Sequence, residues 1–444
     1  MSTKTELRAR RCRRPTRGTR RLRARRRLAG AGWLVLLLGL SGTAPAQEEP
    51  KTDSCVACHA ALPAHLGAPV EGMKQDVHTK HGLSCADCHG GDSAVMDLTS
   101  MAPERGFRRK PARAEVPELC GRCHSDAAFM RRYNPGLPTN QRERYRTSVH
   151  GRRLAEGDQK VATCISCHGV HGIREGGRAD SPVYRANIPA TCGRCHSNPE
   201  YMAEYKIPAN QEDLYRGSVH GELLLQKRDL SAPTCTTCHD NHGASPPGLT
   251  SIAEVCGQCH VNNAAFFISS RHKPAFDRLG LPECVTCHSN HGVHRTSDAM
   301  LGVGGDALCS RCHATDSAGY AAAAQMRQYV EQLKQEMEKA DAALRRAEAL
   351  GMEVSDARYE FQSINAILIQ TRTDVHRFSQ DHLRATAAPG VDLAQRTERL
   401  AQAALAEAQA RRRNLLFPLA AIIAVMVFLA LKLRRLEARD SSQT

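Results

Sequence analysis

Nine copies of the motif Cys-x-x-Cys-His, packed into residues 55–313, constrain the fold of this chain more than any other feature. Every cysteine after residue 46 belongs to one of them, and a histidine directly follows each second cysteine. The one remaining cysteine, Cys12, lies near the N-terminus. The motifs begin at Cys55, Cys85, Cys120, Cys164, Cys192, Cys235, Cys256, Cys284 and Cys309.

This spacing is typical of c-type haem attachment. Two thiols separated by two residues can add to the vinyl groups on one edge of a porphyrin, and the next histidine is then held under the ring as an axial ligand of the iron. The sequence therefore predicts nine covalently bound haem c groups, attached to Cys55, Cys58, Cys85, Cys88, Cys120, Cys123, Cys164, Cys167, Cys192, Cys195, Cys235, Cys238, Cys256, Cys259, Cys284, Cys287, Cys309 and Cys312. The predicted proximal ligands are His59, His89, His124, His168, His196, His239, His260, His288 and His313.

Two other uses of paired cysteines fit less well. Zinc ribbons contain Cys-x-x-Cys pairs but do not require a histidine after every second cysteine, and disulfide frameworks do not require it either. Aromatic residues make up only 4% of the chain, a thin supply for a conventional core. Because a porphyrin is a large apolar body, we expect haem to fill the interior, with short helices and long loops draped over it.

The motifs belong to an internal repeat. Residues 120–151 and 192–221 are the same unit with two residues deleted. A full module contains a lone histidine, a doubled motif Cys-x-x-Cys-His-x-x-His and a second, simple motif. Three modules follow this pattern, the first departs from it because Asp92 occupies the position that matches His171, and the motif at Cys55 stands alone in front.

Twelve further histidines after residue 46 can supply the sixth ligands of nine irons. A histidine three residues after its own motif cannot easily reach over the same ring, so those of the doubled motifs should serve neighbouring haems. Met130 and Met202, which recur in the repeat, should pack against haem, with axial ligation as the alternative. The predicted distal ligands are His65, His78, His81, His150, His171, His220, His242, His272 and His291.

The N-terminal 46 residues are typical of a signal peptide. A basic stretch at 8–27 precedes an apolar stretch at 28–42 and a small-residue cleavage site at 44–46, with an uncleaved anchor as the alternative. This segment holds 13 of the 61 basic residues and one of the 46 acidic residues, so the remainder carries 48 bases against 45 acids. The formal charge of +15 therefore gives no reason to expect a nucleic-acid partner.

The sequence after His313 changes to a helical pattern. Apolar residues recur at intervals of three and four over 330–347 and again over 361–378, Gly351 separates the two runs, and the Ala-Pro-Gly sequence at 388–390 predicts a second break. This pattern predicts an antiparallel hairpin or coiled-coil stalk, and a third helix from about Asp392 into the membrane. The hairpin is a spacer or a means of oligomerisation, or else His382, or His376 beside it, ligates a haem at its base.

An apolar run at 415–431 is long enough for one membrane span, with a buried soluble helix as the alternative. Basic residues flank both of its ends, so only the exported N-terminus orients it. The predicted order is a signal peptide (1–46), a nonahaem domain of short helices and irregular loops (47–318), an all-α helical hairpin or stalk (319–410), one transmembrane helix (411–433) and a cytoplasmic tail (434–444). The expected location is the bacterial inner membrane, with the haem domain on the periplasmic side.

The repeated Cys-x-x-Cys-His-x-x-His-Gly units and the lone histidines in Ser-Val-His-Gly resemble the multihaem c-type cytochromes of bacterial respiration, over about residues 55–313. These include periplasmic penta- and decahaem carriers and membrane-anchored, quinol-linked proteins. The quinol-oxidising anchored relatives carry their membrane helix at the N-terminus, which argues against direct quinol oxidation here.

The resemblance implies electron transfer in anaerobic respiration, between a quinol-oxidising membrane complex or cytochrome and a periplasmic reductase or electron carrier. The alternative is a reductase of nitrite, hydroxylamine or a sulfur oxyanion with one five-coordinate haem. A sensing or structural role based on the helical hairpin is a third reading.

Overall fold

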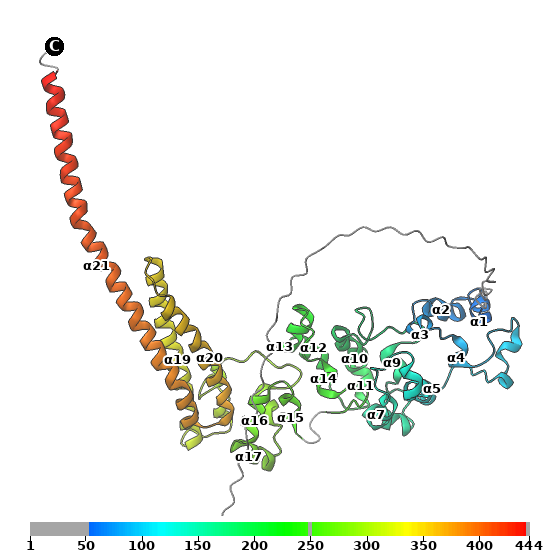
Figure 1. The fold of residues 1–444 in the computed structure, drawn as a ribbon. Coiled ribbons are helices and arrows are strands. Elements are labelled where there is room, and N and C mark those ends of the chain that lie inside the picture. The colour runs from blue at the N-terminus through cyan, green and yellow to red at the C-terminus, as the bar shows by residue number, and fades with distance from the viewer. Residues whose placement is uncertain (1–52, 247–250, 441–444) are drawn as a thin grey trace, which may run out of the picture. The chain divides into compact units, whose positions relative to one another are not determined.

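A computed structural model describes residues 53–246 and 251–440, and every regular element within these ranges is helical (Figure 1). The predicted leader at 1–46 lies outside the described residues. Two parts differ in character: a motif region (residues 53–317) of short helices and long connections, and a bundle (residues 318–410) of long helices.

The motif region follows the expected pattern of short helices, most of which carry or flank a motif. Its α-helices are α1 (Ser54–His59), α2 (Ala64–Met73), α3 (Val77–Lys80), α4 (Cys85–His89), α5 (Val116–His124), α6 (Ala127–Arg131), α7 (Gln141–Thr147), α8 (Val149–Ala155), α9 (Cys164–His168), α10 (Ile188–His196), α11 (Pro199–Ala203), α12 (Gln211–Arg216), α13 (Val219–Gly221), α14 (Cys235–His239), α15 (Ile252–Gly257), α16 (Val261–Ile268), α17 (His272–Leu279) and α18 (Glu283–His288). The 3-10 turns are η1 (Leu98–Met101), η2 (Pro103–Arg105), η3 (Arg113–Glu115), η4 (Arg185–Asn187), η6 (Asp298–Met300) and η7 (Cys309–Arg311), and η5 (Glu222–Gln226) is a π-helical turn.

Apolar side chains form little shared core in the motif region. Among the described residues, one cluster lies wholly within it, centred on Tyr215, Leu224 and Ala232. Other buried apolar residues, such as Val70 and Val116, are scattered along the chain. A region of this size normally buries one contiguous apolar core, so this arrangement fits an interior filled by a cofactor.

The bundle contains three helices that lie side by side, α19 (Ala318–Ala349), α20 (Ser355–Asp374) and the first half of α21 (Gln380–Asp440) (Figure 1). The predicted break at Gly351 is confirmed, with the glycine at φ +72°. The residues predicted to face inward on α19, from Val330 to Ala347, are buried. Among them, Leu333, Met337 and Ala340 pack in one cluster with Ile364 of α20 and Ala394 of α21. Many contacts involve alanine, which lets the helix axes approach closely.

The predicted break at 388–390 is wrong. Helix α21 runs through Pro389, and the chain turns earlier, in the 3-10 turn η8 (Val375–Arg377) and at Phe378. A side chain at Gly390 would bring its Cβ within 2.8 Å of Leu333 Cδ1, so this glycine is needed where three helices meet. Burial of Leu383 and Ala394 on both sides of Pro389 offsets the backbone hydrogen bond that the proline removes.

Helix α21 leaves the bundle after Ala408 and continues as a single exposed helix. Its C-terminal half is the one stretch of the described chain that is long and apolar enough to cross a membrane, with a mean hydropathy of 2.6 over the most apolar window. The third helix is therefore both a member of the bundle and the membrane-span candidate.

Candidate functional site

Three of the four motifs that lead a module, those at Cys85, Cys164 and Cys235, begin as a capped helical turn. In these, the side chain of the second residue between the two cysteines accepts a hydrogen bond from the backbone N–H just before the first cysteine. Ser84 N donates to Asp87 Oδ2 (2.7 Å), Thr163 N to Ser166 Oγ (3.0 Å), and Thr234 N to Thr237 Oγ1 (3.0 Å). These bonds satisfy a donor at the helix start and present both thiols from one short turn.

The residue directly after the histidine ends the turn in the four motifs that lead a module. Gly90, Gly169, Asp240 and Ser289 all have positive φ, between +64° and +81°. This left-handed conformation stops the helix and reverses the chain, which carries the following residues away from their own motif.

The Ser-Val-His-Gly segments position two of the lone histidines. Ser148 Oγ accepts a hydrogen bond from Gly151 N (2.9 Å) and donates one to Tyr145 O (2.6 Å). A Cβ at Gly151 would lie 2.0 Å from the same carbonyl oxygen, so only glycine fits there. Ser218, Tyr215 and Gly221 repeat this arrangement around His220.

Three of the lone histidines are also tied to the doubled motif of the following module. The backbone N–H directly before each of them donates to the carbonyl oxygen two residues beyond the second histidine of that motif. Three such bonds, of 2.9–3.0 Å, join Val77 to Ile173, Val149 to Ala244, and Val219 to Val293. The modules therefore interlock.

Eight of the nine motif histidines face a second histidine. In each pair the ring centres lie 5.9–6.3 Å apart. The pairs, motif histidine first, are His89 with His171, His124 with His78, His168 with His242, His196 with His150, His239 with His291, His260 with His220, His288 with His376, and His313 with His272.

This separation matches two imidazoles on opposite sides of one metal ion. A histidine nitrogen binds such an ion at about 2 Å, and the ring centre lies roughly 1 Å further out, which puts two opposed ring centres about 6 Å apart. Burial lowers the pKa of His150, His168 and His376, among others, which favours the neutral imidazole that binds metal. The eight pairs thus fit haem iron with two axial histidines.

Carbonyl groups hold several proximal rings by the opposite nitrogen. His59 Nδ1 lies 3.3 Å from Leu66 O, His89 Nδ1 3.2 Å from Arg108 O, and His239 Nδ1 3.1 Å from Ser245 O. When Nδ1 carries the proton and donates it, Nε2 keeps the lone pair for a metal, which is the usual outer support of a ligating histidine.

His78 has a carboxylate partner instead. The buried Asp76 accepts hydrogen bonds from the His78 backbone N (2.9 Å) and ring Nδ1 (2.8 Å), and from Ile173 N (2.7 Å). Burial raises the pKa of Asp76, but these hydrogen bonds outweigh it and hold the pKa below its ordinary value. Asp76 is therefore a negatively charged support for a candidate axial ligand.

His65 and His81 are placed differently from the other predicted distal ligands. The His81 ring lies edge-on to Tyr133, with ring centres 5.8 Å apart, and His65 is exposed on α2. The described part of the chain shows no histidine ring opposite His59 at the separation of the other pairs. Ligation by His65 and His81 stays a prediction without this geometric support.

His376, which was not among the nine preferred distal ligands, faces His288. It lies in the bundle, outside the repeat. The repeat itself could have pointed to it. The second histidine of each doubled motif faces the leading motif of the preceding module, and no module follows His313 to supply such a histidine to His288. Met130 and Met202 are buried, while His294 and His382 are exposed.

The thiols of successive motifs lie close enough to affect one another's pKa. The Cys164 thiol raises the pKa of Cys120 and the Cys120 thiol lowers that of Cys164, and two further pairs interact in the same way. Burial raises the pKa of Cys88, and the nearby Cys120 and Cys123 thiols raise it further. In chain order the neighbours are Cys55 with Cys85, Cys88 with Cys120 and Cys123, Cys120 with Cys164, Cys167 with Cys195, Cys192 with Cys235, Cys238 with Cys256 and Cys259, Cys256 with Cys284, and Cys287 with Cys309 and Cys312.

The donor groups fit haem c better than a bare metal ion. The eighteen described cysteines are all free of disulfide bonds, as attachment to haem requires. Within the described residues, no group of three or more histidine, cysteine or acidic side chains converges on one point, so the histidines form pairs and not four-ligand clusters.

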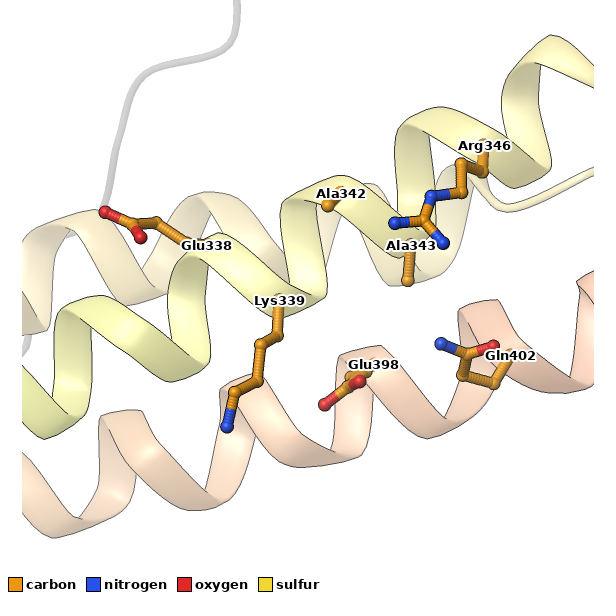
Figure 2. A pocket seen from close by; sticks show the side chains of 7 residues that line it. All are labelled: Glu338, Lys339, Ala342, Ala343, Arg346, Glu398 and Gln402. Atoms are coloured by element: carbon orange, nitrogen blue, oxygen red, sulfur yellow. The ribbon is translucent and has the colours of Figure 1, made fainter.

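A groove between α19 and α21 is separate from these sites (Figure 2). Charged side chains of both signs border two alanines at the seam of the helices, and no histidine or cysteine lines it. The lining residues are Glu338, Lys339, Ala342, Ala343, Arg346, Glu398 and Gln402.

Comparisons with known proteins agree with the geometry. A family model described as cytochrome c3 matches residues 77–197. A second model, described as a doubled CXXCH motif, matches residues 229–265 and 272–318. No solved structure matches the chain.

Proposed function

Because the chain belongs to the multihaem c-type cytochromes, we propose that it is a nine-haem electron conduit, anchored by α21 in the bacterial inner membrane with its motif region in the periplasm. It passes electrons in anaerobic respiration between a quinol-linked membrane partner and a periplasmic reductase or carrier.

The observation that carries this proposal is the proximity of the thiols of each motif to those of the next, which is close enough for each thiol to affect the pKa of its neighbour. Covalent attachment places a haem edge at each thiol pair. Adjacent pairs therefore hold adjacent haems, and this holds at all eight steps from Cys55 to Cys312. An unbroken series of short steps is what electron tunnelling along a protein requires.

The histidine pairs support transfer over substrate chemistry. An iron with two axial histidines has no open position for a substrate, while its potential is set by the ligands and their hydrogen bonds. Eight motif histidines have a partner at the required separation. We assign the corresponding eight haems to electron transfer.

The length of α21 supports an external electron donor. About 35 residues separate the haem-proximal start of α21 from the apolar run at Leu415, which corresponds to about 50 Å at the helical rise. This gap is far longer than a single tunnelling step. Electrons from membrane quinol therefore reach the motif region through a partner that itself extends above the membrane.

The test combines haem counting with redox kinetics on the full-length protein in detergent. Intact mass and a pyridine haemochrome assay should give nine haems per chain. After rapid mixing with a small reduced donor, all nine should become reduced in one connected process. A lower haem count, or a group of haems that the donor reduces only on a far slower timescale, would overturn the conduit.

One observation favours a second function. His59 has no facing histidine in the described residues, and Asp92 occupies the repeat position that would have supplied one. A five-coordinate haem at Cys55 and Cys58 could bind nitrite, hydroxylamine or a sulfur oxyanion. A high-spin ferric signal of one haem that shifts on addition of nitrite, together with catalytic nitrite consumption, would establish the reductase.

A further inference from the structure

The turn between α20 and α21 is packed against the motif region. The turn η8 contacts α16, which begins directly after the motif histidine His260, and α20 contacts α16 as well. The buried side chain of Asp374 fixes the shape of the turn through two hydrogen bonds. Its carboxylate accepts them from Thr386 Oγ1 (2.6 Å) and from Arg377 Nε (3.1 Å). The turn therefore has a fixed conformation and packs against α16.

His376, at the centre of this turn, has the geometry of an axial ligand. Its ring centre lies 6.0 Å from that of His288, with 22° between the ring planes. His376 Nδ1 lies 3.0 Å from Thr373 O, and the Asn263 amide nitrogen lies 3.2 Å from Nδ1 and 3.5 Å from Nε2. When Nδ1 donates its proton to the Thr373 carbonyl group, the lone pair of the ring is on Nε2.

The repeat leaves one position that His376 fills. The leading motifs of the first three modules receive their facing histidine from the doubled motif of the next module: His89 faces His171, His168 faces His242, and His239 faces His291. His288, in the leading motif of the fourth module, has no later module to serve it, because the sequence contains no cysteine after Cys312.

The two residues that follow His376 also contact the motif region. The Arg377 guanidinium lies 3.5 Å from the centre of the Phe266 ring. The Phe378 ring packs on His272, with ring centres 3.8 Å apart, and His272 itself faces His313 at 5.9 Å. Three consecutive residues of one turn thus contact the motif region, and two of them, His376 and Phe378, contact candidate haem ligands.

We propose that His376 is the distal ligand of the haem attached to Cys284 and Cys287, so that the helical bundle supplies an iron ligand to the motif region. This rests on the assignment of haem c to the motifs and holds whether the protein is a conduit or a reductase. The bundle is then part of the redox centre and not only a spacer, because the last two haems depend on its turn for their surroundings.

The test is electron paramagnetic resonance of the oxidised, full-length His376→Ala protein, after intact mass has confirmed an unchanged number of haems. One haem equivalent should move from the low-spin to the high-spin ferric signal, and added imidazole should restore it. His382→Ala, which removes an exposed histidine six residues away, is the matched control and should leave both signals unchanged.

A fully low-spin His376→Ala spectrum with the original number of haems would overturn the proposal, as would an equal change in His382→Ala. Should His376→Ala fail to fold, His376→Met keeps a ligand at the same place. It should stay low-spin, gain the thioether-to-iron charge-transfer band and raise the potential of one haem. An unchanged spectrum and potential in His376→Met would equally refute the assignment. If the proposed electron conduit were wrong, the result would be different: some haems of the unmodified protein would be reduced slowly.

Discussion

The imidazole planes of His239 and His291 are nearly parallel, with an angle of 5° and ring centres 5.9 Å apart. His168 and His242 are similar at 6°, whereas His78 and His124 lie at 83°, and His272 and His313 at 72°. The angle between the two imidazole planes is thus larger where a simple motif pairs with a lone histidine than where a leading motif pairs with the histidine of a doubled motif. The repeat therefore builds two kinds of iron environment in alternation.

These angles predict two classes of low-spin ferric spectrum. Parallel axial imidazoles separate the iron d orbitals and give a resolved rhombic signal, while nearly perpendicular ones leave two orbitals close in energy and give a broad, strongly anisotropic signal. Electron paramagnetic resonance of the oxidised protein should show both. His272→Ala should remove one haem equivalent of the anisotropic class, and His242→Ala one of the rhombic class. A spectrum with rhombic signals alone would contradict the geometry.

Asp76→Asn should raise the potential of the haem attached to Cys120 and Cys123. The carboxylate bonded to His78 Nδ1 makes this ligand more electron-donating, which stabilises the ferric state. We expect a rise on the order of tens of millivolts, since a tenfold change in a one-electron equilibrium corresponds to about 59 mV. Spectroelectrochemical titration measures it. Asp126→Asn removes a carboxylate near the same haem that bonds only to backbone N–H groups, so an equal shift there would disprove the hydrogen-bond effect.

Asp298 should make the docking of the loop before the last motif dependent on pH. Two hydrogen bonds from Arg372 (2.7 and 2.9 Å) hold the pKa of Asp298 below its ordinary value against the effect of burial, and Lys334 assists. A lowered folded-state pKa adds stability above the unfolded value of about 3.9, and that stability disappears as the pH falls through the folded value. Asp298→Asn should therefore cost about 1 kcal/mol at neutral pH and nothing in strong acid.

Thermal unfolding followed by circular dichroism at several pH values checks this prediction. Asp306→Asn, an exposed residue of the same segment, should not alter stability at any pH. A stability difference between Asp298→Asn and the unmodified protein that persists below the folded pKa would show that the lost charge is not its cause.

Gly221→Ala should disturb the site of His220. The added Cβ would lie 2.0 Å from Tyr215 O, so the turn that carries His220 must shift. Overpacking of this kind costs about 1–3 kcal/mol, and we expect a lower melting temperature together with a partial high-spin signal. Gly177→Ala, at a position with open space around it, is the control. Normal spectra and stability in Gly221→Ala would contradict the close approach.

Local patterns predicted much of this arrangement. The Cys-x-x-Cys-His spacing predicts the attachment residues, and seven of the preferred distal histidines lie opposite a motif ring, because the repeat places equivalent residues in equivalent surroundings. The inward face of α19 followed from its apolar spacing. The continuous helix through residues 388–390 did not follow from the sequence. Pro389 and Gly390 normally end a helix, but here the glycine lets three helices meet. His376 was raised only as the alternative to His382, because the sequence does not show which histidine of the bundle turn lies against a distant motif.

On the proposal that α21 crosses the membrane, its length sets the distance between the motif region and the lipid. One continuous helix joins the turn at Phe378 to the apolar run, so the motif region would be held at a height that this helix determines. Soluble carriers would then meet it without approaching the headgroups, and membrane donors would have to extend to the same height. Removing whole helical turns between Ala408 and Leu415 would lower that height while leaving every haem contact as it is, so reach and redox chemistry are encoded in separate parts of the chain.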